Sequence, residues 1–205
     1  MSLITKIEVQ KNDDTRANIY VDDKFYAGVS IELIVKNQLK KGLEIENQLL
    51  DDIIIEDEKS SALSKALKYS SSNLKTKKQI RDYLKKKEYN SQTIEYVIEK
   101  MSEYNYLDDE AYAKAYLLTY SKKYGKLRLI NDLKNRGISE TIIDNLFADD
   151  FEINNSIEEV ANKYLKNKEV NEQTLIKLNR FLYSRGYEFE DISKLLSEIR
   201  RNKWE

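Results

Sequence analysis

The chain has 205 residues, of which 40% are hydrophobic and 35% charged, a composition typical of a soluble helical protein rather than a disordered one. It has no cysteine and no histidine, which excludes disulfides, thiolate metal sites and the commonest general base. No segment approaches the ~20 apolar residues of a membrane span. We therefore expect a cytoplasmic protein without cofactor or membrane association.

The net charge of −1 hides an uneven distribution. Residues 1–57 carry 7 basic and 12 acidic side chains, whereas residues 58–106 carry 11 basic and 6 acidic ones. The acidic beginning and the basic segment after it almost cancel, so the charge is bipolar.

Residues 1–57 are expected to form a small β-rich region with one short helix. Strands are predicted near residues 3–11, 16–22 and 24–29. Asp22 and Asp23 form a two-residue turn signal between the last two, because short polar side chains tolerate a left-handed backbone. Ser30 is expected to cap a helix running to about Leu39. Three short strands are marginally stable alone, so the sheet should pack on a neighbour.

From about residue 58 onward the sequence repeats with a period of 49 residues. Leu84, Leu133 and Leu182 occupy one repeat position, and apolar residues around them keep the same register. A fixed period of this length indicates tandem structural units. We predict a mostly α-helical protein with three tandem three-helix repeats after the β-containing region. The expected divisions are residues 1–57, 58–106, 107–155 and 156–205.

The first repeat indicates where its three helices lie. The first helix is predicted at about residues 57–69, from its apolar stripe. A capping-box pattern starts the second helix at Thr76, and that helix ends near Lys87. The third helix opens at Asn90 or Ser91.

One position distinguishes the first repeat from the others. Gly137 and Gly186 follow the second helices of repeats 2 and 3, where a left-handed residue commonly ends a helix. The first repeat has Glu88 there. If the φ angle of Glu88 is positive, glycine should be preferred at this position; if the helix runs through it, glycine should be unfavourable.

Basic residues on the second helices are the candidate binding residues. In the first repeat, Lys77, Lys78, Arg81 and Lys85 are expected to project away from the apolar stripe. They are interpreted as contacts for phosphates or for acidic surfaces; the alternative is a solvated helix face. Basic residues of repeats 2 and 3 are candidates of the same kind: Lys126, Arg128, Arg136, Arg180 and Arg185. For the last-turn residues, a favourable interaction with the helix dipole is a sufficient alternative.

Acidic and aromatic clusters are assigned structural roles. Asp108, Asp109 and Glu110 are expected at a helix N-terminus, where negative charge is favourable, and not in a metal site. Five of the 15 tyrosines fall on core positions of the repeats rather than on a base-stacking surface: Tyr83, Tyr89, Tyr116, Tyr164 and Tyr187. For Tyr69, Tyr120 and Tyr124 both roles stay open.

Three segments resemble motifs of the regulatory protein RecX family. Tyr106–Ala113 is similar to its "YLDDxxFA" motif. The segment 125–138 is similar to "GxxRIxxeLxxKGI", and 180–187 to "RFLxRRGF". The β-containing beginning resembles the longer form of low-GC Gram-positive bacteria. Departures are Glu88 in place of the usual glycine, and tyrosine at two positions where phenylalanine is common.

The resemblance implies a negative regulator of the RecA recombinase. Such a protein binds along the groove of the RecA–ssDNA filament and inhibits ATP hydrolysis, strand exchange and filament growth; we expect it to be a monomer and not an enzyme. The alternative is a helical repeat module that acts on DNA directly, since three-helix units with a basic second helix resemble helix-turn-helix geometry. The near-neutral chain and its acidic beginning make DNA the weaker partner.

Overall fold

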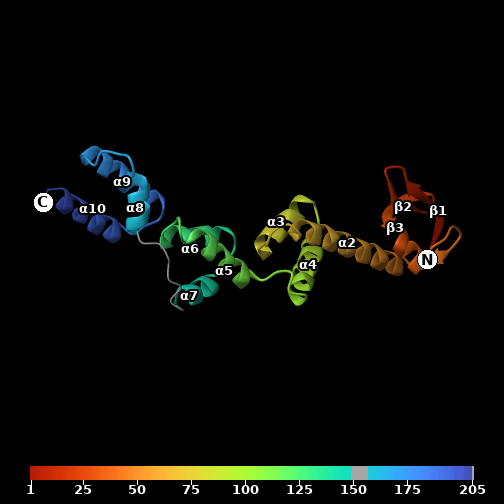
Figure 1. Cartoon of the computed structure of the whole chain (residues 1–205). Helices are drawn as coiled ribbons and strands as arrows, with labels where there is room; N and C mark the ends of the chain where they lie inside the picture. Colours follow the sequence, from red (N-terminus) through yellow and green to blue (C-terminus); the bar gives the residue numbers. More distant parts are fainter. Residues whose placement is uncertain (149–156, 205) are drawn as a thin grey trace. The chain divides into compact units, whose positions relative to one another are not determined.

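The computed structural model describes residues 1–148 and 157–204, which form two compact units (Figure 1). Unit 1 comprises Met1–Ser72 and Ile80–Tyr106, and unit 2 comprises Asn73–Gln79 and Leu107–Glu205. The division expected at residues 155/156 lies outside the described residues.

The N-terminal part of unit 1 is an antiparallel sheet. It has four strands in the order β3-β2-β1-β4: β1 Ser2–Gln10, β2 Asp13–Val21, β3 Lys24–Ser30 and β4 Glu44–Ile45. The three predicted strands are confirmed. Asp22 and Asp23 both have positive φ angles, 49° and 64°, as the tight turn between β2 and β3 requires. No sequence pattern predicted β4, because a strand of two residues is too short to show alternation.

The sheet packs against helices α1 (Ile31–Lys36) and α2 (Asn47–Ser70). Ser30 caps α1, as predicted, through a hydrogen bond that its side chain accepts from Leu33 N. The prediction that the next helix begins near residue 57 was wrong, because α2 begins at Asn47 and crosses the expected division at 57/58. The added turns bury Leu50 and Ile53 in the sheet's core, which the strands alone do not complete.

The remaining chain is helical. Its elements are α3 Lys77–Lys86, α4 Ser91–Glu103, α5 Asp109–Tyr120, α6 Lys126–Asn135, α7 Glu140–Ala148, α8 Ile157–Leu165, α9 Glu172–Ser184 and α10 Phe189–Trp204. Leu84, Leu133 and Leu182 are each 0% exposed, in agreement with the predicted repeat core. The capping box at α3 is confirmed: Gln79 N donates to Thr76 Oγ1, and Thr76 N donates to Gln79 Oε1, both at 3.1 Å.

The second helices α3, α6 and α9 end in the same way. Glu88, Gly137 and Gly186 have φ angles of 63°, 84° and 82°. After α6, Gly137 N donates to Lys134 O and Ile138 N to Leu133 O, and the same two bonds recur after α3 and α9. This pair of bonds is a Schellman motif, in which a left-handed residue closes the helix. The positive-φ alternative for Glu88 is confirmed.

We expect Glu88→Gly to stabilise unit 1 by about 1 kcal/mol. An L side chain is strained in the left-handed region, and glycine relieves that strain. Glu88 is exposed, so removing its side chain leaves no cavity. Urea denaturation followed by circular dichroism measures the effect, with Glu88→Ala as the control that removes the carboxylate but keeps the strain. A glycine variant no more stable than the alanine variant would contradict this account.

Candidate partner-binding surface

Successive second helices meet end to end within unit 2. At the start of α6, Gly125 N donates to Arg185 O at 2.9 Å and Leu127 N donates to Gly186 O at 3.2 Å. The N–H groups at a helix N-terminus and the carbonyls at a C-terminus lack partners within their own helices. Here each helix end provides partners for the other, so the joint couples repeats 2 and 3.

The same joint recurs one repeat earlier, at the beginning of α3. Thr76 Oγ1 donates to Arg136 O at 2.7 Å, at positions 49 residues before Gly125 and Arg185. Lys78 Nζ donates to Asn135 O at 3.0 Å. Arg128 makes the corresponding contact between repeats 2 and 3, donating from Nη1 to Ser184 O at 3.0 Å.

The joints explain why glycine follows α6 and α9 but not α3. A Cβ added at Gly186 would lie 2.4 Å from Arg128 N, and one at Gly137 would lie 2.5 Å from Lys78 Cβ. Neither position therefore has room for a side chain larger than the hydrogen of glycine. Glu88 is exposed, so a side chain fits there at the cost of backbone strain only.

Arg136 is committed to the interior of repeat 2. Its Nε donates to Tyr112 Oη at 3.1 Å and its Nη1 to Asp132 O at 3.1 Å, and its guanidinium lies 4.5 Å from the centroid of the Tyr116 ring. Burial and the hydrogen bond that Tyr116 donates to Asp132 raise the pKa of Tyr116 above its ordinary value. The tyrosine therefore stays neutral beside the cation.

Two of the four basic residues predicted to form an outward face of α3, Arg81 and Lys77, contact carboxylates of other helices. Arg81 forms a two-pronged ion pair with Glu95, at 2.8 and 3.0 Å, and its hydrogen bond lowers the pKa of the Glu95 carboxyl. Lys77 is only half exposed, and its backbone N–H donates to Asp109. These contacts of Arg81 and Lys77 were not expected, because a pattern on one helix does not reveal carboxylates from its neighbours. Lys78 and Lys85 are exposed.

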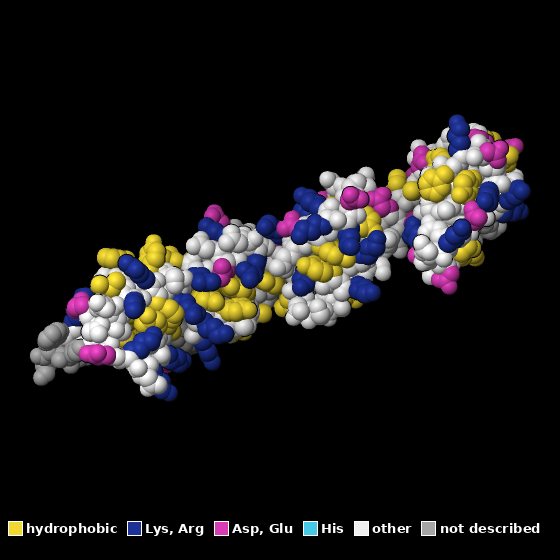
Figure 2. Space-filling view, turned by 90° about the horizontal axis from the view of Figure 1, so that it is seen from above, with side chains coloured by type: hydrophobic (Ala, Val, Ile, Leu, Met, Phe, Trp, Pro, Cys, Tyr) yellow, Lys and Arg dark blue, Asp and Glu magenta, His cyan; other side chains and the backbone are white. Residues whose placement is uncertain are grey.

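Each second helix carries at least one exposed predicted cation: Lys85 on α3, where Lys78 is also exposed, Lys126 on α6 and Arg180 on α9. We call Lys85, Lys126 and Arg180 the second-helix cations. Lys126 lies 5.5 Å from the ring centroid of Phe147. On the face drawn in Figure 2, lysine and arginine side chains lie beside exposed hydrophobic ones over the helical part of the chain. Basic groups beside apolar surface are suited to binding a macromolecular partner.

The sequence did not indicate a basic pocket in unit 2. Arg185, one of the predicted residues, lines it together with Lys122, Lys123 and Lys163, and its volume is about 430 Å³. These residues come from three separate segments of the chain, and they do not occupy equivalent positions in the repeats. No periodicity therefore marked them.

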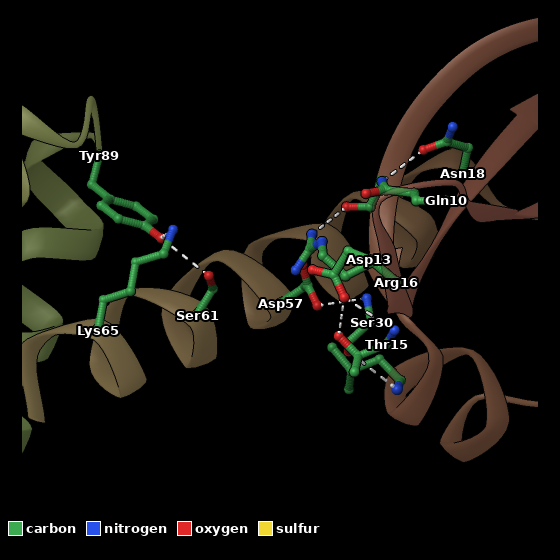
Figure 3. A network of polar contacts seen from close by, with 12 residues as sticks. Gln10, Asp13, Thr15, Arg16, Asn18, Ser30, Asp57, Ser61, Lys65 and Tyr89 are labelled. Carbon is green, nitrogen blue, oxygen red and sulfur yellow. Dashed lines mark hydrogen bonds and ion pairs between the residues drawn. The ribbon is translucent and has the colours of Figure 1, made fainter. Parts of the chain in front are cut away.

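A second hollow, of about 880 Å³, lies in unit 1 and is lined by residues of β2, β3 and α2. Figure 3 shows the polar contacts among its lining residues. Asp57, which is 5% exposed, accepts hydrogen bonds there from Arg16 Nη2 at 2.7 Å and from Ser30 N at 2.8 Å. Lys65 Nζ donates to Tyr89 Oη at 2.8 Å and links α2 to the start of α4. All these groups have partners within unit 1, so the network fastens the sheet to α2.

The described residues contain neither a metal-binding cluster of side chains nor a membrane-spanning helix. Within residues 1–148 and 157–204, no group of three or more acidic side chains is placed to hold a metal ion. Asp108 Oδ1 instead accepts hydrogen bonds from Glu110 N and Ala111 N, both at 2.9 Å, which confirms the predicted helix cap. None of the helices in the described part combines the length and apolar character that crossing a bilayer requires.

The fold defines a class: a β-sheet unit followed by three-helix repeats with exposed basic groups. Three family models match the chain in order. They are the regulatory protein RecX N-terminal domain over residues 2–46, the RecX first three-helix domain over 62–101 and the RecX second three-helix domain over 108–146.

Relatives match along nearly the whole chain. Regulatory protein RecX of Clostridium acetobutylicum is 37% identical, covering 96% of this chain and 95% of that protein. The Bacillus subtilis protein of the same name is 33% identical, covering 97% and 78%. This chain belongs to the RecX family of regulatory proteins, as its motifs indicated, and these relatives are named as regulators rather than enzymes.

Solved structures have the same fold. A crystal structure of regulatory protein RecX superposes with a TM-score of 0.63 at 25% identity, covering 97% of this chain and 100% of that one. RecX from Lactobacillus salivarius superposes with a TM-score of 0.58 at 22% identity, covering 70% and 97%.

Proposed function

We propose that this protein is a negative regulator of the RecA recombinase that binds, as a monomer, along the groove of the RecA–ssDNA filament. Membership of the RecX family supports a regulatory role, and the resemblance of the motifs implies the recombinase as the partner. In this proposal the bound protein inhibits ATP hydrolysis, strand exchange and filament growth. It needs no cofactor, because inhibition follows from binding.

The observation that carries the proposal is that every second helix carries exposed cations, among them Lys85, Lys126 and Arg180, which lie at different repeat positions. A filament is a helical polymer that offers the same surface many times. Tandem repeats that each contribute a contact suit such a partner, because the first contact raises the effective concentration of the next.

Within unit 2, the end-to-end joint holds the second helices α6 and α9 together. The α9–α6 joint is made of backbone hydrogen bonds, with glycines that permit close approach. When two contact residues are held by a rigid connection, binding the second one costs little additional conformational entropy. Contacts with neighbouring filament subunits then oppose the rearrangements that turnover and growth require.

We expect the triple variant Lys85→Glu/Lys126→Glu/Arg180→Glu to lose inhibition of RecA ATP hydrolysis and co-sedimentation with RecA–ssDNA filaments. Each change replaces attraction to an acidic surface by repulsion. All three side chains are exposed, so the melting temperature should stay within a few degrees of the parent's. ATP hydrolysis on single-stranded DNA, measured against inhibitor concentration, gives the effect.

The matched control is Lys11→Glu/Lys41→Glu/Lys194→Glu, which makes the same charge change at exposed lysines outside the second helices. It should inhibit as the parent does. If the second-helix triple variant inhibits equally well, the proposed contact is wrong. Binding to bare single-stranded DNA, compared with filament binding at two salt concentrations, separates direct DNA binding from filament binding, because affinity for DNA falls steeply with salt.

A further inference from the structure

The basic pocket of unit 2 has the features of a binding site that the filament proposal does not use. Four cations line it: Lys122 and Lys123 just after α5, Lys163 on α8 and Arg185 at the end of α9. The other lining residues are Val160, Tyr164 and Phe181, and the lining contains no carboxylate. We call the four cations the rim of the pocket and the three other residues its floor.

The rim cations are available to a ligand. Lys122, Lys123 and Lys163 are exposed and form no ion pair with any residue in the described part of the chain. Like charges held close together repel one another, and an anion bound among them relieves that repulsion. The pocket therefore selects a ligand with more than one negative charge.

The aromatic rings of the pocket indicate which kind of anion fits. The rings of Tyr164 and Phe181 stack with their centroids 4.6 Å apart. Lys168 Nζ lies 3.3 Å from the Tyr164 centroid, and the Arg185 guanidinium lies 4.9 Å from that of Phe181. The ring faces are thus occupied by neighbouring side chains. Single-stranded nucleic acids bind aromatic residues through open ring faces, and this pocket does not offer them.

We propose that the pocket binds a short acidic segment of a partner protein, in which carboxylates flank an apolar side chain. The carboxylates pair with the lysines at the rim, and the apolar side chain lies against Val160 and the edge of the ring pair. The volume of about 430 Å³ is within the range of ligand pockets, roughly 300–1,000 Å³. This inference does not depend on the recombinase proposal, because it concerns other residues and a segment of any partner.

The test uses the full chain and a fluorescein-labelled synthetic peptide that alternates glutamate with leucine. Fluorescence anisotropy measures its Kd for the parent protein and for the variant Lys122→Glu/Lys163→Glu. We expect the variant to bind at least about tenfold more weakly, a change of about 1.4 kcal/mol, because two attractive contacts become repulsive. A peptide with serine in place of leucine should also bind the parent more weakly, since the apolar floor then has no partner.

The matched control is Lys177→Glu/Lys194→Glu, which reverses two exposed lysines of the same unit outside the pocket. It should bind the leucine peptide as the parent does, and circular dichroism verifies that both variants are folded. Equal loss in both variants overturns the proposal in favour of general charge attraction. Absence of peptide binding to the parent also overturns the proposal. If an oligothymidylate then binds the parent and binds the pocket variant more weakly, the pocket is a site for single-stranded nucleic acid instead.

Discussion

Replacing Leu133 by alanine should lower the free energy of unfolding of unit 2 by about 2–5 kcal/mol, the range for buried leucines. Leu133 is 0% exposed and lies in the core of repeat 2 with Tyr116, Leu129 and Ile143. The removed atoms leave a cavity that flanking helices fill only partly, because their ends are fixed by caps and joints. A small repeat has little further core to compensate.

Urea denaturation combined with hydrogen exchange of amides in unit 2 measures this loss, because two compact units need not unfold in one step. Leu118→Ala is the control: this leucine of α5 is 68% exposed, and its replacement should change stability by about 0.5 kcal/mol or less. A Leu133→Ala protein as stable as the control would contradict the repeat core.

Replacing Gly186 by alanine should destabilise unit 2 by about 2–4 kcal/mol. Part of this cost is backbone strain, because Gly186 has a φ angle of 82°, and an L residue there costs roughly 1–2 kcal/mol. The rest is steric, since the new Cβ would lie 2.4 Å from Arg128 N and backbone cannot move aside as a flexible side chain does.

Gly42→Ala separates the two contributions. Gly42 has a φ angle of 83°, but an added Cβ would meet nothing within 4 Å, so only the strain remains. Hydrogen exchange gives the stability loss of each variant in its own unit. It should also show faster exchange at Leu127 N–H, which donates to Gly186 O, in the Gly186 variant alone. Equal losses in the two variants, with unchanged exchange at Leu127, would mean that the joint does not contribute.

Features formed by residues close in the chain were predictable. The 49-residue period located the buried leucines, and the residue four positions after each of them has the left-handed backbone that ends the helix. Asp22-Asp23 marked its turn, and Thr76 and Asp108 marked helix starts. In each case a few neighbouring residues satisfy each other's backbone groups, so the local sequence contains the whole interaction.

Features that depend on distant partners were not predictable. Asn47–Asp57 became helical because its apolar residues complete the core under the sheet, although its acidic residues obscured the pattern. The prediction for Arg81 did not anticipate Glu95, 14 residues away, whose carboxylate pairs with it. The four cations of the basic pocket are brought together only by packing between repeats 2 and 3.

The sequence by itself therefore determined the family, the repeat organisation and the way each second helix ends, because period, motifs and caps are properties of neighbouring residues. Only the tertiary structure decided which basic residues are available to a partner. Arg128 and Arg136 are half-buried and hydrogen-bonded in a joint and in the core of repeat 2, whereas Lys85, Lys126 and Arg180 are exposed. The physical reason is that a charged side chain is neutralised, buried or left free by groups that reach it through space, and their positions are set by packing rather than by the local sequence.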